Sequence, residues 1–326
     1  MTVPAVLHRR HLLALPLLRA LPAHADEPFP NRPVTLVVPY AAGGVTDSLA
    51  RLMARRLTER WGQQVLVDNK PGGGTVIGTA LAARAPADGY TLLLTSFGFI
   101  ANQVMLPNLP YAPAALEPLS LLGVAPGVLF VHPSVPATTV PEFVRWLRER
   151  RQPAAFASSG NGSSVHVMAE LFAAALGVEI LHVPYKGNAP GLADLMGGQV
   201  QAMFDSPGSL GHARSGRLRA LGITSAERSM LAPELMPIAK AGEPALAGFE
   251  AGSWFGFLLP AAVPKALQAR LHADLQAVMA PQAMQEELVR IGIEPRPMSQ
   301  SAFAAYLGQQ LATWGPVIRA KNIKPD

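Results

Sequence analysis

Two short stretches of glycine and polar residues in this 326-residue sequence have the composition of anion-binding loops. The first, residues 39–47, reads Pro-Tyr-Ala-Ala-Gly-Gly-Val-Thr-Asp and joins an apolar, β-branched run to a segment with helical spacing of apolar residues. Glycines let a backbone come close to a ligand, and the free N–H groups of a helix start favour an anion. An ordinary tight turn, with Thr46 as N-cap and Asp47 complementing the helix dipole, is the alternative. The candidate ligand-binding residues of this stretch are Tyr40, Ala41, Ala42, Gly43, Gly44, Thr46 and Asp47.

The second stretch, residues 158–164, reads Ser-Ser-Gly-Asn-Gly-Ser-Ser and lies between an expected strand at 154–157 and an expected helix at 164–176. Hydroxyl and amide groups are neutral donors that can hold a carboxylate without an arginine. A capping loop with Ser163 as N-cap is the alternative. Because open α/β sheets bind ligands at the carboxyl ends of their strands, two such loops predict one shared site. The candidates here are Ser158, Ser159, Asn161, Gly162 and Ser163.

An acidic residue is expected beside these loops. Asp205 ends an apolar run at 200–204 that predicts a strand, so its side chain should face the same cleft. A carboxylate there repels a carboxylate ligand, but it fits if it holds a bridging water or accepts a hydrogen bond from an amino or hydroxyl group of the ligand. Capping of the following helix is the alternative role.

Other chemistries have weaker support in the sequence. Residues 72–78, Gly-Gly-Gly-Thr-Val-Ile-Gly, lack the dinucleotide-binding spacing because Ile77 stands where a glycine is needed. There is no cysteine, and the five histidines beyond residue 25 show no paired ligand spacing, so neither a metal nor a cofactor is predicted. A hydrolase that uses a serine from residues 158–164 with His166 and Asp205 stays open as the enzyme alternative, although no G-x-S-x-G elbow is present.

The first 25 residues have the features of a secretory signal peptide. A basic start at His8-Arg9-Arg10 precedes an apolar stretch at 12–21 and the small-residue site Ala23-His24-Ala25. This leader has three arginines and no acidic residue, so its removal lowers the formal net charge from +5 to +2. Export to the periplasm is predicted, by the general or the twin-arginine route. The remaining chain has no run of Lys and Arg interleaved with aromatics, so nucleic acid is not an expected partner.

Strand-like and helix-like segments alternate along the rest of the chain. One series comprises residues 34–38, 47–61, 65–67, 76–84 and 90–95, and a second comprises residues 128–131, 140–150, 154–157, 164–176 and 180–183. This alternation predicts an α/β fold with parallel sheets and right-handed crossovers. Two series predict two lobes: residues 26–126 start the first, residues 127–247 form the second, and residues 248–326 return to the first. The helices near 300–318 are expected to pack on the first lobe.

With these loops in place, the chain from about Phe29 onward resembles the Bug, or TctC-like, family of tripartite tricarboxylate transporter receptors. The matching stretches, in order, are residues 39–47, 88–92, 157–162, 182–187, 197–200, 203–205, 224–228 and 253–256. The resemblance implies a type II periplasmic-binding-protein-like fold, with two Rossmann-like lobes and a hinge. It also implies a carboxylate held by both loops, partly through water, and places Ser96, Tyr185 and Asp205 near the ligand.

The same resemblance implies a periplasmic receptor without catalysis or cofactor. It would capture a small carboxylate in the cleft and deliver it to the membrane components of a tripartite tricarboxylate transporter, and it is expected to be a monomer. Members of the family accept dicarboxylates, tricarboxylates, amino acids and aromatic acids, so the acid itself stays open. Thr75 and Val76 stand where the family usually has glycine and asparagine, and Ala41 and Val45 replace common prolines, so the far end of the ligand is not inferred.

Overall fold

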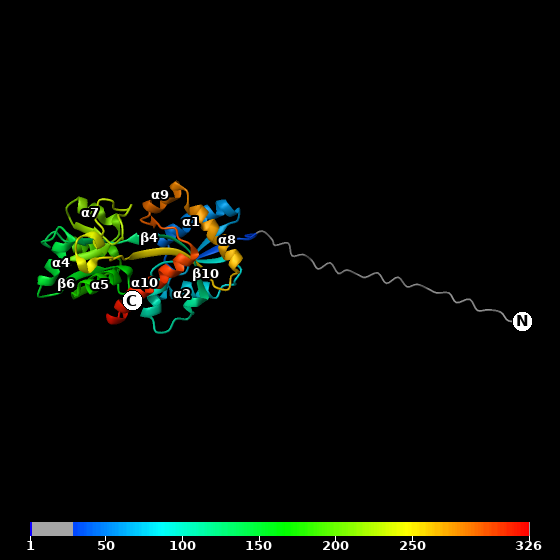
Figure 1. Ribbon diagram of the computed structural model, residues 1–326, viewed down its shortest axis with the longest axis horizontal. Helices are drawn as coiled ribbons and strands as arrows, with labels where there is room; N and C mark the ends of the chain where they lie inside the picture. Colours follow the sequence, from blue (N-terminus) through cyan, green and yellow to red (C-terminus); the bar gives the residue numbers. More distant parts are fainter. Residues whose placement is uncertain (2–28, 326) are drawn as a thin grey trace.

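The chain folds into two α/β lobes, each built on its own sheet (Figure 1). The computed structural model describes Met1 and residues 29–325, so the predicted signal peptide lies, apart from Met1, outside the described residues. A six-stranded sheet has the order β11-β4-β10-β3-β1-β2, and a five-stranded sheet has the order β7-β6-β8-β5-β9. The expected two-lobed α/β fold is confirmed, while the lobe boundaries at 126/127 and 247/248 stay a prediction.

Lobe 1 carries the six-stranded sheet and is formed by both ends of the described chain. Its elements are β1 (Val34–Val38), α1 (Val45–Trp61), β2 (Val65–Asn69), α2 (Val76–Ala83), β3 (Thr91–Thr95), α3 (Gly98–Met105), β4 (Leu116–Pro126), β10 (Gly252–Pro260), α8 (Lys265–Met279), α9 (Gln282–Arg290), β11 (Glu294–Pro295) and α10 (Gln300–Ala320). Strand β1 alternates between two cores. Leu36 and Val38 pack with α1 and α8, whereas Val37 packs with α2, α3 and α10.

Lobe 2 carries the five-stranded sheet between residues 128 and 223. Its elements are β5 (Val128–Val131), α4 (Val140–Glu149), β6 (Ala154–Ser158), α5 (Ser164–Leu176), β7 (Ile180–Pro184), α6 (Asn188–Met196), β8 (Ala202–Asp205), α7 (Leu210–Arg214) and β9 (Arg219–Ile223). Phe156 and Phe204 are fully buried beneath α4 and α5. Burial of each such ring contributes about 1.5–3 kcal/mol and holds β6 and β8 against these two helices.

The prediction of parallel sheets holds for only part of each sheet. Strand β1 pairs in parallel with β2 and β3, and β6 pairs in parallel with β7 and β8. However, β10 is antiparallel to β3 and β4, and β5 is antiparallel to β8 and β9. Strands β5 and β10 enter their sheets directly from the other lobe, so their direction is set by the crossing and not by a crossover helix. The two-residue strand β11 is also antiparallel to β4.

Helix α10 contacts more of the molecule than the sequence predicts. It packs on β4 and α3 of lobe 1, as expected, and it also contacts α5 of lobe 2. Figure 1 shows it running from lobe 1 towards lobe 2, with the end of the chain beside α5. The helix continues through Pro316 because its apolar residues Trp314 and Ile318 are buried between the lobes.

Candidate functional site

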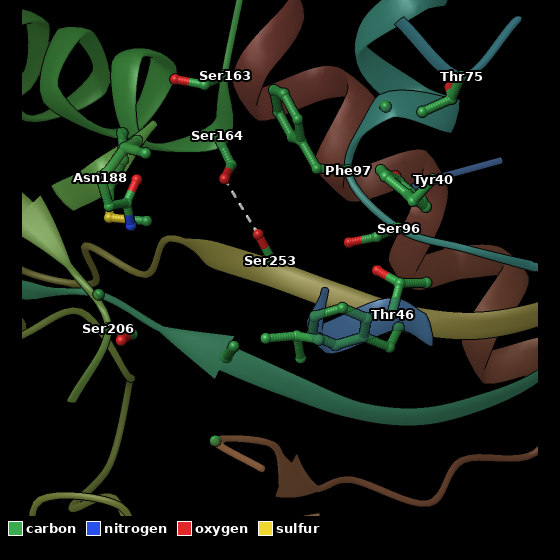
Figure 2. Close-up of a pocket in the computed structure, with 18 of the residues that line it drawn as sticks. Tyr40, Thr46, Thr75, Ser96, Phe97, Ser163, Ser164, Asn188, Ser206 and Ser253 are labelled. Atoms are coloured by element: carbon green, nitrogen blue, oxygen red, sulfur yellow. Dashed lines mark hydrogen bonds between the residues drawn. The ribbon is translucent and has the colours of Figure 1, made fainter. Parts of the chain in front are cut away.

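A cavity of about 950 Å³ lies between the two lobes. Figure 2 shows Tyr40, Thr46 and Ser96 on one side of it and Asn188 and Ser206 on the other. This volume is at the upper end of the range of about 300–1,000 Å³ that small-molecule sites occupy. The cavity is therefore large enough to enclose a small organic acid.

The first loop supports the start of α1 with a buried acid. Gly44 is the N-cap and makes no side-chain cap, so the alternative that Thr46 caps the helix is wrong. Gly43 has φ +88°, and its N–H donates to Oδ2 of Asp47 at 2.9 Å. Arg51 Nε donates to the same oxygen at 3.0 Å. Burial alone raises the pKa of Asp47, but these hydrogen bonds outweigh it and hold the pKa below its usual value.

Three residues of lobe 1 bring hydroxyl groups to the cavity. Thr46 belongs to the first turn of α1, Tyr40 precedes that helix, and Ser96 follows β3. Thr46 and Ser96 are buried, whereas Tyr40 is half-buried. Burial raises the pKa of the Tyr40 phenol to about 12, so this group stays protonated and can donate.

The second loop is supported by hydroxyl and imidazole groups. Ser158 Oγ lies 2.6 Å from His182 Nε2 and donates to the carbonyl of Gly160 at 3.1 Å. The Gly162 N–H donates to His166 Nδ1 at 3.2 Å, and the two imidazole rings stack 3.4 Å apart. Ser163 is the N-cap of α5, as the capping alternative predicted. The loop thus has a defined shape before any ligand arrives.

Asp205 ends β8 at the lobe 2 wall of the cavity and is 4% exposed. Its carboxylate accepts hydrogen bonds from Ser209 Oγ at 2.5 Å and from Asn188 Nδ2. Burial raises the pKa of Asp205, and the hydrogen bonds offset this only in part. Asp205 therefore orients Asn188, which begins α6 and also lines the cavity.

The structure brings about half of the sequence candidates to the cavity surface. Eight line it: Tyr40, Ala41, Thr46, Ser96, Asn161, Gly162, Ser163 and Asp205. Seven do not line it: Ala42, Gly43, Gly44, Asp47, Ser158, Ser159 and Tyr185. Gly43, Asp47 and Ser158 of the second group make hydrogen bonds within the loops. The Tyr185 hydroxyl instead donates to Asp194 at 2.7 Å, on α6.

Sequence reasoning missed several residues that line the cavity. The polar ones are Thr75, Asn102, Ser164, Asn188, Ser206, Ser253 and Arg290. Asn102 Nδ2 donates to the carbonyl of Gly74 at 2.6 Å, and Ser253 Oγ donates to Ser164 Oγ at 3.2 Å (Figure 2). Short patterns held a signal for three of them: Ser164 ends the second loop, Ser206 follows Asp205, and Asn188 follows a glycine at the start of a helix. Thr75, Asn102, Ser253 and Arg290 are brought to the cavity by contacts distant in sequence.

The charge and shape of the lining restrict the chemistry. Among the described residues that line the cavity, Asp205 and Arg290 have the only charged side chains. The walls are otherwise neutral polar groups and apolar side chains, including Phe97, Met168 and Phe255. Such a surface suits an organic acid with an apolar body, bound through hydrogen bonds and not through a cluster of cations.

The contacts of Ser158 and Asp205 do not fit the catalytic relay of the hydrolase alternative. Ser158 Oγ lies 2.6 Å from His182 Nε2, but Ser158 is fully buried and does not line the cavity. Asp205 hydrogen-bonds to Asn188 and Ser209. A Ser-His-Asp relay needs the acid on the histidine and the serine facing the substrate.

Within residues 29–325, no helix is long and apolar enough to cross a membrane, and no cluster of three metal-ligating side chains occurs.

Comparisons with known proteins agree with the geometry. The model of the tripartite tricarboxylate transporter family receptors matches residues 49–323. BugT of Bordetella pertussis is 34% identical over 309 residues, which cover 94% of each chain. An R. palustris protein solved with adipate is 35% identical with a TM-score of 0.75, covering 91% of this chain and 100% of that one. MatC from Rhodopseudomonas palustris, solved with bound malate, is 29% identical with a TM-score of 0.70, covering 89% of this chain and 100% of that one. The resemblance inferred from the motifs is confirmed: the chain belongs to the tripartite tricarboxylate transporter receptor family.

Proposed function

We propose that this protein is a periplasmic receptor that captures a small carboxylate in the cavity between its lobes. The observation that carries the proposal is the convergence of two helix-start loops, one from each lobe, on a single cavity. Two relatives of the same fold were solved with adipate and with malate, which are both carboxylates. Their ligands support the class of ligand proposed here.

The acid group is expected to lie between the two loops. Helix α1 begins without a side-chain cap, and its first turn contributes Val45 and Thr46 to the cavity. A helix start stabilises an anion by about 0.3–2 kcal/mol, and each hydrogen bond to a charged group adds about 1.5–3 kcal/mol. Asn161 of the second loop, with Tyr40 and Ser96, provides the proposed neutral donors, while the Ser163 hydroxyl donates to the carbonyl of Gly160 at 2.8 Å.

The rest of the ligand is expected to be apolar, apart from groups that meet Asn188 and Arg290. Phe97, Met168 and Phe255 line the space beyond the loops. Asn188 donates to Asp205 through Nδ2, so its amide oxygen remains as an acceptor for a hydroxyl or amino group. Arg290, exposed at the end of α9, is placed to meet a second acid group.

The proposal includes export, delivery and the absence of catalysis. Cleavage after Ala25 would release a chain that begins at Asp26 in the periplasm. That chain is expected to be a monomer and to deliver its ligand to the membrane components of a tripartite tricarboxylate transporter. Mass spectrometry of periplasmic material tests the cleavage: a mature amino terminus at Asp26 is expected, and intact protein beginning at Met1 in the cytosol would contradict export.

Thermal unfolding with a panel of acids tests the binding. The panel is malate, adipate, hexanoate and benzoate, with sulfate as the inorganic control. An acid at about 100 times its Kd adds roughly 2.7 kcal/mol of apparent stability, which is a clear melting shift. At least one organic acid, and not sulfate, is expected to give this shift. If no organic acid raises the melting temperature, or if an ester is hydrolysed with loss of turnover in Ser163→Ala, the proposal is wrong.

A further inference from the structure

The segment after α10 turns back into the space between the lobes. Asn322 has φ +47°, its N–H donates to the carbonyl of Arg319, and the N–H of Ile323 donates to the carbonyl of Ile318. This pair of bonds around a left-handed residue is a Schellman-type helix end, which asparagine tolerates well. The turn directs residues 323–325 away from the helix axis and towards the cavity, whose wall includes Pro325.

Ile323 is held in an apolar cluster made by both lobes. It is 5% exposed and belongs to the same buried cluster as Phe97 and Met105 of lobe 1 and Val167 and Leu171 of lobe 2. Trp314 of α10 lies in this cluster too, with its ring 4.6 Å from that of Phe97. Separation of the lobes would expose part of this cluster to water, so the cluster favours close approach.

Lys321 adds a polar contact to lobe 2. Its Nζ lies 3.0 Å from Glu179 Oε2 and 3.6 Å from Glu170 Oε2. Glu179 is exposed, but Glu170 belongs to α5 and its side chain is 7% exposed. Burial raises the pKa of Glu170, and Lys321 partly opposes this. Withdrawal of Lys321 would leave a buried carboxylate without its cation, which is unfavourable.

Pro325 fits against a glycine of each lobe. A Cβ on Gly162 would lie 2.9 Å from Cα of Pro325, which is closer than real contacts allow. A Cβ on Gly74 would lie 3.6 Å from Cβ of Pro325. Gly162 also has φ +67°, so both its backbone conformation and this contact require glycine.

We infer that residues 321–325 form a third connection between the lobes and position the Gly162 loop over the cavity. Within residues 29–325, the chain crosses from lobe 1 to lobe 2 around Gly127 and returns between β9 and β10. The segment adds contacts that exist only when the lobes are close, so it shifts the population towards the closed arrangement before a ligand binds. Ile323 and Pro325 are thus positioning residues, whatever acid the cavity holds.

Distance measurements between the lobes test this inference without any ligand. The sequence has no cysteine, so Ile77→Cys in lobe 1 and Leu181→Cys in lobe 2 can carry the only two spin labels. Both positions are exposed, at 56% and 57%. The distance distribution would be measured by double electron–electron resonance after refolding from denaturant to remove bound ligand. The variants are a chain that ends at Asn322, Ile323→Ala and Gly162→Ala, with Lys324→Ala as the control, because Lys324 is exposed.

The first three variants are expected to show a shifted and broader distribution, and Lys324→Ala the parent distribution. In the chain that ends at Asn322, adding Gly162→Ala should produce no further shift, because the residue it would displace is gone. If the shortened chain fails to melt cooperatively, Ile323→Ala and Gly162→Ala decide by the same measurement. Parent-like distributions in all folded variants would overturn the inference. Tighter adipate binding by the shortened chain would also overturn it, because the segment would then compete with the ligand.

Discussion

The two loops at the cavity stabilise their glycines in different ways. In lobe 1, Asp47 accepts from the Gly43 N–H, and α1 starts without a side-chain cap. In lobe 2, Ser163 caps α5, and the Gly162 N–H donates to a histidine. Gly162 reaches the cavity surface, whereas Gly43 does not. The comparison indicates that lobe 1 offers the backbone of a helix start and lobe 2 offers side chains on a tightly packed loop.

Each lobe also has a buried aspartate near its loop, and folding shifts the pKa values of these two aspartates in opposite directions. Asp47 and Asp205 are each 4% exposed. Hydrogen bonds from a backbone N–H and an arginine outweigh burial at Asp47 and lower its pKa, while burial dominates at Asp205 and raises its pKa. Folding therefore favours the ionised form of Asp47 and the protonated form of Asp205.

The largest expected effect is the loss of stability on replacing Gly162, which should exceed the loss on replacing Gly43. Gly162→Val places a branched side chain at φ +67° and against Pro325, and should lower the free energy of unfolding by about 3 kcal/mol. Gly43→Val places a branched side chain at φ +88°, but no atom lies within 4 Å of its Cβ. This substitution should therefore lower the free energy of unfolding by about 1–2 kcal/mol. Urea unfolding measures both. Equal costs would show that the contact with Pro325 contributes nothing.

Asp47→Asn should reduce stability by about 1–2 kcal/mol at pH 7, because the loop and Arg51 lose a charged acceptor. The pKa of Asp47 is lowered on folding, so its contribution is present above its ordinary pKa of about 3.9 and is lost as pH falls through the lower folded value. The difference between parent and variant should therefore shrink in acid. A difference that grows from pH 7 to pH 3 would contradict the assignment.

Asp205→Asn should show the opposite pH dependence. The pKa of Asp205 is raised on folding, so its contribution to stability is full below about pH 3.9 and is lost as pH rises through the folded value. The parent should therefore gain stability relative to the variant as pH is lowered from 7 to 4. Urea unfolding across this range measures the difference. The same pH dependence for both acids would remove the contrast between the lobes.

Arg290→Gln should have the smallest effect. Arg290 is exposed, and exposed charge pairs contribute up to about 1 kcal/mol, which is roughly a fivefold change in Kd. Calorimetry with adipate and with hexanoate separates a charge effect from a shape effect, because the two acids share a chain length and differ in one carboxylate. Weaker binding of adipate alone is expected. An equal loss for both acids would place Arg290 outside the recognition of a second acid group.

The sequence predicted the features that depend on neighbouring residues. The glycine loops, the Ser163 cap and the position of Asp205 at a strand end all follow from short patterns. It could not predict that Ser253, Phe97 and Pro325 reach the same cavity, because strand crossings and the turn after α10 bring them there. It also placed Gly43 and Tyr185 at the ligand, whereas in the structure the Gly43 N–H donates to Asp47 and the Tyr185 hydroxyl donates to Asp194.

Both lobes are proposed to hold the same carboxylate. Calorimetric titration of the panel acid with the largest melting shift tests it in Thr46→Val of lobe 1 and Asn161→Ala of lobe 2. Ser159→Ala is the matched control, because Ser159 lies in the second loop without lining the cavity. Loss of one hydrogen bond to a charged group should weaken binding at least about tenfold in each of the two variants and leave the control unchanged. Parent-like binding in either Thr46→Val or Asn161→Ala would contradict the proposal that both lobes hold the acid.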